Sequence, residues 1–349
     1  MATKVQSLMS SQAVPTDFSV TYLEDAATLQ APVRLTVIEA VSFKQTCQDL
    51  IEGGSPPKQI FIDFQNTTFM DSSGLGSLVS NFKNSQDKGI KVTLLNVTPQ
   101  VMAVLNLTGL DQVFPIESRP EIASVPTHNP KDTGKNNARK VDPLPETHSS
   151  VASWMKRVID IVGSLVGLVI TSILFLPIAI AIQIDDPGPI FFKQTRCGWM
   201  GKRFSIWKFR SMCVDAEARK SQIKNQAQGA FFKNDNDPRI TKVGNFLRRT
   251  SLDELPQFWN VLKGEMSLVG TRPPTPGEVE SYEVPEWQRL DVKPGMTGEW
   301  QVNGRSKVRS FEDVIRLDLK YQRNWSLIYD LKLIFKTITI LFNKNSGAV

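Results

Sequence analysis

The sequence contains little histidine and little cysteine, and this narrows the chemistry that it can support. Among 349 residues there are two histidines, His128 and His148, and three scattered cysteines, Cys47, Cys197 and Cys213. Both histidines fall in a stretch that is interpreted below as a linker. We therefore expect no disulfide framework, no zinc site and no acid–base catalysis by histidine, and the cysteine usage suits a reducing compartment.

The N-terminus also lacks the long apolar core of a secretory signal, so we expect nothing there to export the chain. Hydrophobic residues make up 41% of the chain and charged residues 22%, which excludes a disordered chain and a membrane protein with many spans. The net charge of +6 suits an anionic partner, whether lipid head groups, nucleic acid or nucleotide phosphates. No recognition motif, aromatic platform or dense basic stripe points to nucleic acid.

Composition divides the chain into three zones. Residues 17–117 are typical of a soluble mixed domain, and 118–150 are rich in Pro, Asn, Thr, Ser and charge. A segment of that composition cannot bury a core, so we predict a flexible linker. Residues 151–345 form the third zone, which we predict to be a mainly helical second domain. The fold class that follows is α+β with two domains.

Strands and helices alternate in the first zone. The apolar runs 59–64 and 90–95 predict buried strands, and 77–84 and 99–107 have helical spacing, the last ending near Gly109. This β–α pattern predicts a parallel pair of strands. Asp71 or Ser72 can cap the first of these helices, whose free N–H groups would also seat a phosphate.

The turn before that helix resembles the signature of the STAS domain, the fold of anti-sigma-factor antagonists. The resemblance rests on Met70-Asp71-Ser72-Ser73-Gly74-Leu75-Gly76 and on Leu107-Thr108-Gly109-Leu110. It implies that Ser72 is phosphorylated by a partner kinase and that this domain is regulatory. The alternative is that Ser72 is only a helix cap.

Residues 161–184 carry no charge, and the predicted membrane segment is 158–184. As one straight helix the uncharged run would be about 36 Å long, enough to cross a bilayer. However, Pro177 would interrupt the helix, and basic residues lie on both sides of the run. We predict a re-entrant helix that breaks at Pro177, with a plain span as the alternative. Residues 330–342 predict either an interfacial helix or an ordinary packed terminal helix.

The stretch 246–264 carries the candidate chemistry. Ser251 and Glu254 form a capping-box pattern, and Gly264 is a natural helix stop. This would place Asp253 and Glu254 at the positive end of a helix, close to upstream arginines. A carboxylate in that setting could attack a phosphorus atom while cations hold the phosphate oxygens. The alternative is an ordinary helix start whose acids pair with basic neighbours.

Residues from about 154 to 342 resemble the bacterial sugar transferase family, the monotopic polyprenyl-phosphate phosphoglycosyl transferases. Motifs match in order along this stretch: Lys156-Arg157 with Asp160; Asp186-Pro187-Gly188-Pro189-Ile190-Phe191-Phe192-Lys193-Gln194; Trp207-Lys208-Phe209-Arg210-Ser211-Met212; Ser251-Leu252-Asp253-Glu254-Leu255-Pro256-Gln257; Gly264-Glu265-Met266-Ser267-Leu268-Val269-Gly270; Pro294-Gly295-Met296-Thr297-Gly298; Gln301-Val302-Asn303-Gly304-Arg305; Asn324-Trp325-Ser326-Leu327; and Asp330-Leu331-Lys332.

The resemblance implies a ping-pong transfer of a sugar phosphate from a UDP-sugar to polyprenyl (undecaprenyl) phosphate, which starts exopolysaccharide or glycoconjugate synthesis. Asp253 would be the nucleophile that releases UMP. Glu254 would assist either by coordinating Mg²⁺, which both carboxylates would hold, or by positioning the acceptor. The substrate contacts would come from Lys208, Arg210, Arg248, Arg249, Gln257, Arg272, Arg305 and Asp318. Both domains would lie on the cytoplasmic side of a bacterial membrane, an oligomer is left open, and a protein partner or kinase would act on the STAS-like domain.

Three positions depart from the family pattern. Leu176 stands where Ser usually precedes the proline of the membrane break, Thr271 replaces a proline, and Pro274 stands where an acidic residue is common. None of these changes touches Asp253 or Glu254. The alternative function is a catalytically silent, membrane-anchored STAS adaptor, and retention of both carboxylates speaks against it.

Overall fold

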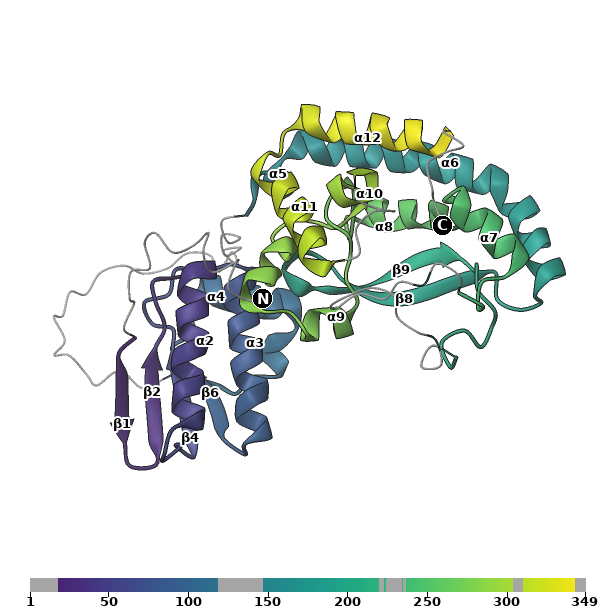
Figure 1. The fold of residues 1–349 in the computed structure, drawn as a ribbon. Helices are drawn as coiled ribbons and strands as arrows, with labels where there is room; N and C mark the ends of the chain where they lie inside the picture. The colour runs from purple at the N-terminus through teal and green to yellow at the C-terminus, as the bar shows by residue number, and fades with distance from the viewer. Residues whose placement is uncertain are drawn as a thin grey trace, which may run out of the picture. The chain divides into compact units, whose positions relative to one another are not determined.

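The computed structural model describes residues 18–118, 147–219, 223, 234, 237–303 and 310–342. The chain divides into two compact units, Met1–Glu146 and Thr147–Val349. Arg305 of the predicted site lies outside the described residues, as does most of the predicted linker. The two units are described separately below, and Figure 1 labels their elements.

A five-stranded sheet forms the centre of the N-terminal unit. Its strand order is β1 (Val20–Leu23), β2 (Ala26–Gln30), β4 (Gln59–Asp63), β6 (Lys91–Leu95) and β7 (Ile116–Glu117). β1 runs antiparallel to β2, and the other neighbours are parallel. Two short strands, β3 (Arg34–Leu35) and β5 (Phe69–Met70), form a separate parallel pair. The predicted β–α pattern with parallel strands is therefore confirmed.

Helices α2 (Val37–Glu52), α3 (Ser72–Asp87) and α4 (Pro99–Thr108) complete this unit, with a single 3-10 turn, η1 (Leu110–Gln112), after α4. Helix α3 begins five residues earlier than the apolar spacing predicted, because the side chain of Asp71 caps it by accepting from the Gly74 N–H at 2.8 Å. Gly109 ends α4 in the left-handed conformation, with φ of 74°. Of the two predicted caps, Asp71 is the one that the structure uses.

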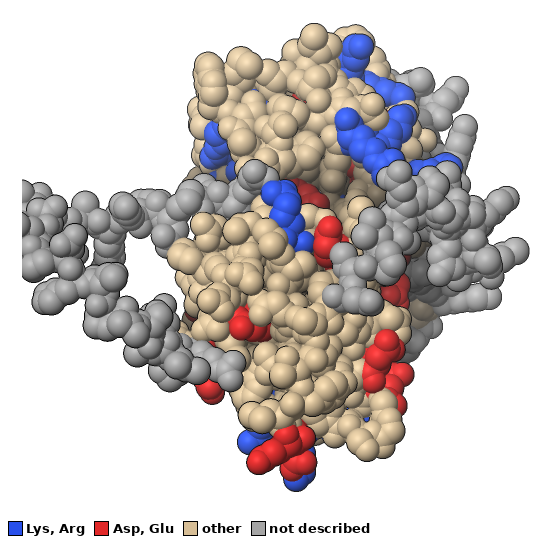
Figure 2. All heavy atoms as spheres, turned by 90° about the vertical axis from the view of Figure 1, so that its left-hand side faces the viewer, with Lys and Arg blue, Asp and Glu red and all other residues tan. Residues whose placement is uncertain are grey.

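The N-terminal unit does not carry the positive charge of the chain. Residues 18–118 hold ten acidic and six basic side chains, a net charge of −4 against +6 for the whole chain. On the face drawn in Figure 2, red acidic side chains accordingly outnumber blue basic ones over the lower part, which is this unit. The excess of basic charge therefore lies outside residues 18–118.

The C-terminal unit begins with one helical turn, α5 (Ser149–Ala152), and the long helix α6 (Trp154–Asp185). An antiparallel hairpin follows, formed by β8 (Phe191–Cys197) and β9 (Arg203–Phe209) and joined through η2 (Trp199–Gly201). The elements that carry the predicted site come next: α7 (Lys242–Arg249), η4 (Leu252–Gln257) and α8 (Phe258–Lys263).

Short elements and two helices complete this unit. Strands β10 (Ser267–Val269) and β11 (Gly295–Thr297) pair in parallel. The remaining elements are α9 (Pro276–Glu280), η5 (Val284–Leu290), α10 (Glu299–Asn303), α11 (Phe311–Arg323) and α12 (Leu327–Phe342). In Figure 1 α12 and the first part of α6 run along the same side of the unit.

Helix α6 is continuous through Pro177. Figure 1 shows the last part of the helix turning away from the direction of the first part, which is the bend that an interior proline produces. The proline therefore bends the helix without interrupting it, and the re-entrant path in a bilayer stays a prediction. Among the described residues, α6 is the one helix whose length and composition would allow it to cross a membrane.

The predicted capping box at Ser251 is wrong. Ser251 has φ of 56°, in the left-handed region, and its side chain caps no helix. The reason is that α7 ends at Arg249, immediately upstream, so Ser251 serves the turn between two helical segments. Residues 252–257 form a 3-10 segment, and α8 then ends at Gly264 with φ of 82°, as predicted.

The sequence places His148 in the linker, but in the structure it belongs to the C-terminal unit. Its Nδ1 accepts from the Ser150 N–H at 3.1 Å, and its Nε2 lies 3.1 Å from the Gln322 carbonyl. The ring also meets Trp325 edge-on, at 6.1 Å between centroids. Since a backbone N–H can only donate, Nδ1 carries no proton and Nε2 donates to Gln322.

Candidate functional site

The two candidate catalytic carboxylates lie in η4, between α7 and α8. Asp253 is buried, with 7% of its surface exposed, and Glu254 is half-buried. The left-handed residue Ser251 turns the chain from α7 into η4. A non-glycine residue in that conformation costs energy and is common at functional turns.

Asn260 fixes α8, and with it η4, against strand β9. Its amide accepts from the Trp207 N–H at 3.2 Å and donates to the Ser205 carbonyl at 2.7 Å. It also donates to Glu265 at 2.7 Å and is completely buried. Because β9 carries Lys208 immediately after Trp207, this contact sets the distance between that lysine and η4.

Lys208 pairs with Glu254 across this junction. The Nζ–Oε1 distance is 2.8 Å, and both side chains keep about a quarter to a third of their surface exposed, 25% and 31%. A partly exposed pair contributes little to stability. It does place a fixed cation beside the two carboxylates, where phosphate charge would have to be neutralised.

A second group of charges forms around Glu278 of α9. Arg272 makes a two-pronged contact with this carboxylate, with three N–O distances of 3.2 Å, and Arg196 Nη1 lies 4.0 Å from it. Burial opposes ionisation of Glu278, but the charge of Arg272 and the hydrogen bonds that it donates outweigh this and lower the pKa of Glu278. Burial, followed by the charge of Arg272, lowers the pKa of Arg196 to about 10, whereas Glu278 and Glu254 act in the opposite direction.

The structure therefore brings together four of the predicted residues and adds two. Asp253, Glu254 and Lys208 meet at the junction of η4 and β9, and Arg272 shares the Glu278 carboxylate with Arg196 of the neighbouring strand β8. Arg196 and Glu278 were missed as site residues, because the sequence shows Arg196 as one of several basic residues after the apolar run. Phe192 of β8 pairs with Lys208 of β9, and Arg196 lies four residues further along β8 than Phe192, a relation that only the pairing of the two strands reveals.

Other predicted substrate residues are engaged elsewhere. Arg210 donates to the Asp186 carbonyl and lies 3.3 Å from its carboxylate, so it holds the turn after α6. Asp318 is paired with Arg289 in a fully buried site, where burial raises its pKa to about 6 despite the arginine. Arg289 also donates to the Arg272 carbonyl at 3.2 Å, so the buried pair is joined to the backbone of residue 272.

The remaining predicted residues flank η4. Arg248 is half-buried and Arg249 exposed in the last turn of α7, and Gln257 is buried at the end of η4. A pocket of about 230 Å³ is lined by four residues of α7, Lys242, Asn245, Phe246 and Arg249. It combines cations with an exposed aromatic ring.

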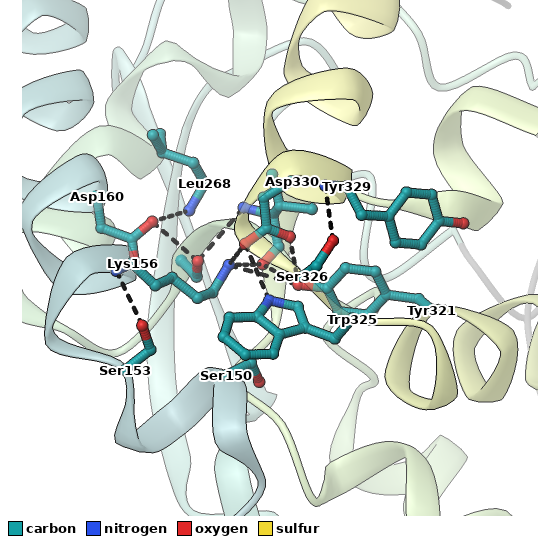
Figure 3. Close-up of polar contacts among 12 residues, drawn as sticks. Ser150, Ser153, Lys156, Asp160, Leu268, Tyr321, Trp325, Ser326, Tyr329 and Asp330 are labelled. Atoms are coloured by element: carbon teal, nitrogen blue, oxygen red, sulfur yellow. Dashed lines mark hydrogen bonds and ion pairs between the residues drawn. The ribbon is translucent and has the colours of Figure 1, made fainter.

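A buried polar network fastens the first turns of α6 to the rest of the unit (Figure 3). Lys156 Nζ lies 2.6 Å from the Asp330 carboxylate and donates to the Val269 carbonyl at 3.0 Å. Asp330 also accepts from Tyr321 and from the Trp325 indole, at 2.9 and 3.1 Å. Motifs about 170 residues apart in the sequence thus form one structural cluster.

The same helix is held along its length toward η4. The carboxylate of Asp160 accepts from the Ser267 hydroxyl and the Leu268 N–H at 2.9 and 2.8 Å. Arg157 donates to the last carbonyls of α8, those of Val261 and Leu262, at 2.8 and 2.6 Å. These contacts join α6 to β10 and to α8, and α8 continues directly from the segment that carries Asp253 and Glu254.

Glycine allows the closest approach between α6 and α8. A Cβ built on Gly167 would lie 2.4 Å from the ring of Phe258, and one on Gly163 would lie 2.5 Å from Leu268. Thr171, one turn after Gly167, also reaches the Leu255 carbonyl of η4 at 3.3 Å. Small residues at four-residue spacing thus bring α6 directly onto the segment that holds Asp253 and Glu254.

Acidic side chains do not form a cage for a metal. No group of three or more His, Cys, Asp or Glu side chains gathers within the described residues. Mg²⁺ is, however, commonly held by one or two carboxylates together with substrate phosphates and water. The adjacent carboxylates of Asp253 and Glu254 fit that donor set.

The predicted phosphorylation site is buried. Ser72 is the first residue of α3, and none of its surface is exposed. Phosphorylation by a kinase would therefore require a conformation in which the first turn of α3 unfolds or moves and exposes the Ser72 hydroxyl.

Sequence comparisons divide the chain in the same way. A model of the STAS domain matches residues 19–123, and a model described as bacterial sugar transferase matches residues 151–344. Among solved structures, a putative anti-sigma factor antagonist from Thermotoga maritima is 27% identical over 30% of this chain and 89% of its own, with a TM-score of 0.27.

Three relatives illustrate the similarity of the C-terminal unit. The galactosyl transferase CpsE of Streptococcus agalactiae is 48% identical over 53% of this chain and 42% of its own length. The UDP-glucose:undecaprenyl-phosphate glucose-1-phosphate transferase of Escherichia coli is 44% identical over 58% of this chain and 43% of its own. The exopolysaccharide production protein ExoY of Rhizobium meliloti is 37% identical over 64% of this chain and 96% of its own.

The chain spans about two fifths of the length of the first two relatives, and nearly all of the third. The match to the transferase model covers more than half of the chain and includes every element around Asp253 and Glu254. The chain therefore belongs to the bacterial sugar transferase family and carries a STAS-like domain at its N-terminal end.

Proposed function

We propose that the protein transfers a sugar phosphate from a UDP-sugar to undecaprenyl phosphate, through a covalent intermediate on Asp253. The observation that carries this proposal is the junction of η4 and β9, where a buried aspartate adjoins Glu254 and its partner Lys208. The relative from Escherichia coli supports the reaction class, since its name describes transfer of glucose 1-phosphate to undecaprenyl phosphate.

The chemistry takes place in two steps. A carboxylate oxygen of Asp253 attacks the sugar-linked phosphorus of the donor, the bond from that phosphorus to the UMP oxygen breaks, and UMP leaves. A phosphate oxygen of the lipid then attacks the same phosphorus, and the carboxylate of Asp253 leaves again. The product is a polyprenyl diphosphate sugar, and the nucleophile is restored.

The surrounding residues would stabilise charge on the transferred phosphate. Lys208, held by Glu254, supplies a cation next to the nucleophile, and Arg272 adds a planar donor that suits phosphate. Asp253 and Glu254 would hold Mg²⁺, which supplies further neutralisation of phosphate charge when it is bound.

The acceptor is a lipid, and α6 offers an apolar surface to meet it. Apolar side chains are exposed along its whole length, among them Val162, Ile173, Leu176 and Ile184. Only 22% of the most apolar 18-residue stretch of this helix is buried. Helix α12 adds Ile328, Leu331 and Phe335. Rows of exposed apolar side chains on a folded unit are typical of contacts with a membrane or with another protein.

The path of α6 can be tested by thiol labelling in spheroplasts. Single cysteines at Ser153 and at Asp186 mark the two ends of the helix, in a background with the three native cysteines replaced. A re-entrant helix leaves both positions unlabelled by an impermeant reagent until the membrane is opened. Labelling of one end from outside would mean that α6 crosses the membrane.

Activity is tested directly by UMP release. Detergent-solubilised protein is incubated with undecaprenyl phosphate, Mg²⁺ and a panel of UDP-sugars that includes UDP-glucose and UDP-galactose. The proposal predicts lipid-dependent release with at least one sugar and none from Asp253→Asn. Silence with all sugars from folded protein would favour the adaptor alternative.

The STAS-like domain would regulate this activity through a protein partner or through Ser72. Removing residues 1–146 tests this, because the cut retains the contacts of His148 and Ser150 with the C-terminal unit. We expect the truncated protein to keep turning over in detergent but to lose its regulation or assembly in cells. Complete loss of turnover from a folded truncated protein would count against a purely regulatory role.

A further inference from the structure

Two arginines share one carboxylate beside the candidate site. Arg272 and Arg196 both face Glu278, so this group carries a surplus of one positive charge. The Lys208–Glu254 pair next to it is neutral. A partly buried excess cation is stabilised by an anionic partner, and a nucleotide diphosphate is the anion that the proposed reaction brings.

The two arginines are held rigidly. Arg196 donates to the Pro273 carbonyl at 2.9 Å and to Gln194 at 2.6 Å, and its remaining Nε is buried without a hydrogen-bond partner in the described part of the chain. Arg272 lies over the Trp300 ring, 5.9 Å from its centroid. Guanidinium groups in fixed orientations lose little conformational freedom when phosphate binds.

Glu278 is itself fixed by the start of α9. Its carboxylate accepts from the Thr275 N–H at 2.6 Å, and its own N–H donates to the Thr275 hydroxyl at 3.2 Å, which completes a capping box. The carboxylate therefore joins the helix start to the arginine on loop 270–275 and to the arginine on β8. Helix α9 thus determines where both cations lie.

We propose that Glu278 is a positioning residue that orients Arg272 and Arg196 toward the phosphate that leaves with UMP, and that Arg196 is a second cation of this donor site. The inference rests on the proposed function. Lys208 contacts Glu254 directly and so belongs with the transferred phosphate. The Glu278 group lies further along the same face of the hairpin, because Arg196 is four residues from Phe192, the strand partner of Lys208, and this position suits the neighbouring phosphate of the donor.

The test is equilibrium binding of UMP to the full-length protein in detergent, together with steady-state kinetics. Glu278→Gln is the sharpest variant, because glutamine keeps the capping hydrogen bonds and removes the charge that orients the arginines. Arg196→Gln removes the second cation. Arg196→Lys keeps the positive charge but lacks the planar guanidinium group, which can donate two parallel hydrogen bonds to a phosphate. Arg316→Gln is the control, since that arginine is 78% exposed on α11.

We expect Glu278→Gln and Arg196→Gln to weaken UMP binding by about tenfold to a hundredfold, the range for loss of one charge-assisted contact, and Arg196→Lys to be intermediate. Values of kcat/KM for the UDP-sugar should fall in parallel, while kcat/KM for the lipid stays within about twofold, because UMP has left before the second step of a ping-pong reaction.

Unchanged UMP binding in either glutamine variant would overturn the inference. Tighter binding by Glu278→Gln would also overturn it, because Glu278 would then be a competitor of the phosphate and not a positioning residue. Thermal unfolding identifies a variant that fails to fold. If a glutamine variant fails to fold, UMP binding by Arg196→Lys tests the inference instead, and unchanged binding by that variant would overturn it. A wild-type protein that binds UMP but transfers no sugar would contradict the proposed function and leave this donor site supported.

Discussion

The Nζ atom of Lys208 lies 2.8 Å from a carboxylate oxygen of Glu254, and this contact joins the β8–β9 hairpin to the segment that carries Asp253. The two residues are 46 positions apart in the sequence. Asn260 maintains the contact, because it binds both the backbone of β9 and α8. The catalytic segment is thus oriented from a neighbouring strand as well as from its own helix.

Replacing Lys208 should reduce turnover without unfolding the protein. Lys208→Gln removes a cation beside the transferred phosphate, and the loss of one such group typically lowers kcat about a hundredfold to a thousandfold. Since the pair with Glu254 is partly exposed, the melting temperature should hardly change. The measurement is steady-state UMP release with a thermal scan of the same sample. Wild-type kcat in the glutamine variant would remove Lys208 from the mechanism.

Breaking the buried ion pair at the start of α6 should lower the stability of the protein, whereas replacing Lys208 should not. Asp330→Ala leaves Lys156 buried without its carboxylate, which costs about 3–5 kcal/mol of stability. Asp313→Ala, which breaks an exposed pair with Arg316, is the matched control and should cost less than about 1 kcal/mol. Thermal unfolding of the two variants in the same detergent compares them. Equal melting temperatures would mean that the network does not hold α6.

A methyl group at Gly167 should disturb the site through packing alone. Its Cβ would lie 2.4 Å from the Phe258 ring, so Gly167→Ala forces α6 and α8 apart at a cost of about 1–3 kcal/mol. We expect lower stability together with lower kcat, because α8 continues directly from η4. Adding Phe258→Leu should restore part of both, whereas Val166→Ala, at a site that is 57% exposed, should be neutral. A fully stable Gly167→Ala protein would show that the two helices do not pack this closely.

The packing of His148 predicts a dependence on pH. Burial, followed by the charge of nearby Lys156, lowers the pKa of His148 below its usual 6.5, although its bond to the Gln322 carbonyl acts in the other direction. Protonation therefore opposes the native contacts. The stabilisation that His148 provides is fully present above about pH 6.5 and is lost as the pH falls through that value toward the lowered pKa.

Thermal unfolding of the wild type and of His148→Gln between pH 8 and pH 5 measures this contribution. The difference between the two proteins should shrink as the pH falls. A difference that stays constant over this range would mean that the histidine does not titrate as described.

Local patterns in the sequence correctly predicted the strands, helices and helix ends that depend on residues close together in the chain. The strand–helix alternation of residues 59–107 was confirmed, because each element buries its own periodic apolar face. Gly109 and Gly264 ended their helices as predicted, since both adopt the left-handed conformation that glycine tolerates.

Contacts between distant segments were not predictable in this way. The predicted capping box at Ser251 is wrong because α7 ends at Arg249, two residues earlier, and the four-residue motif carries no information about the helix before it. Lys156 and Asp330 were noted only as parts of separate motifs, and their ion pair depends on how α6 and α12 pack. Arg196 and Glu278 likewise meet through the tertiary fold, across 82 positions of sequence.

The central claim is that Asp253 carries the sugar phosphate between donor and lipid, and a single-turnover experiment tests it most directly. Purified protein is mixed with excess UDP-sugar, labelled in the sugar-linked phosphate, in the complete absence of polyprenyl phosphate. The account predicts a burst of UMP that approaches one equivalent per protein, with label retained on the denatured chain at Asp253 and discharged when undecaprenyl phosphate is added before denaturation. UMP that appears only when the lipid is present, with no label on the protein in either case, would contradict it.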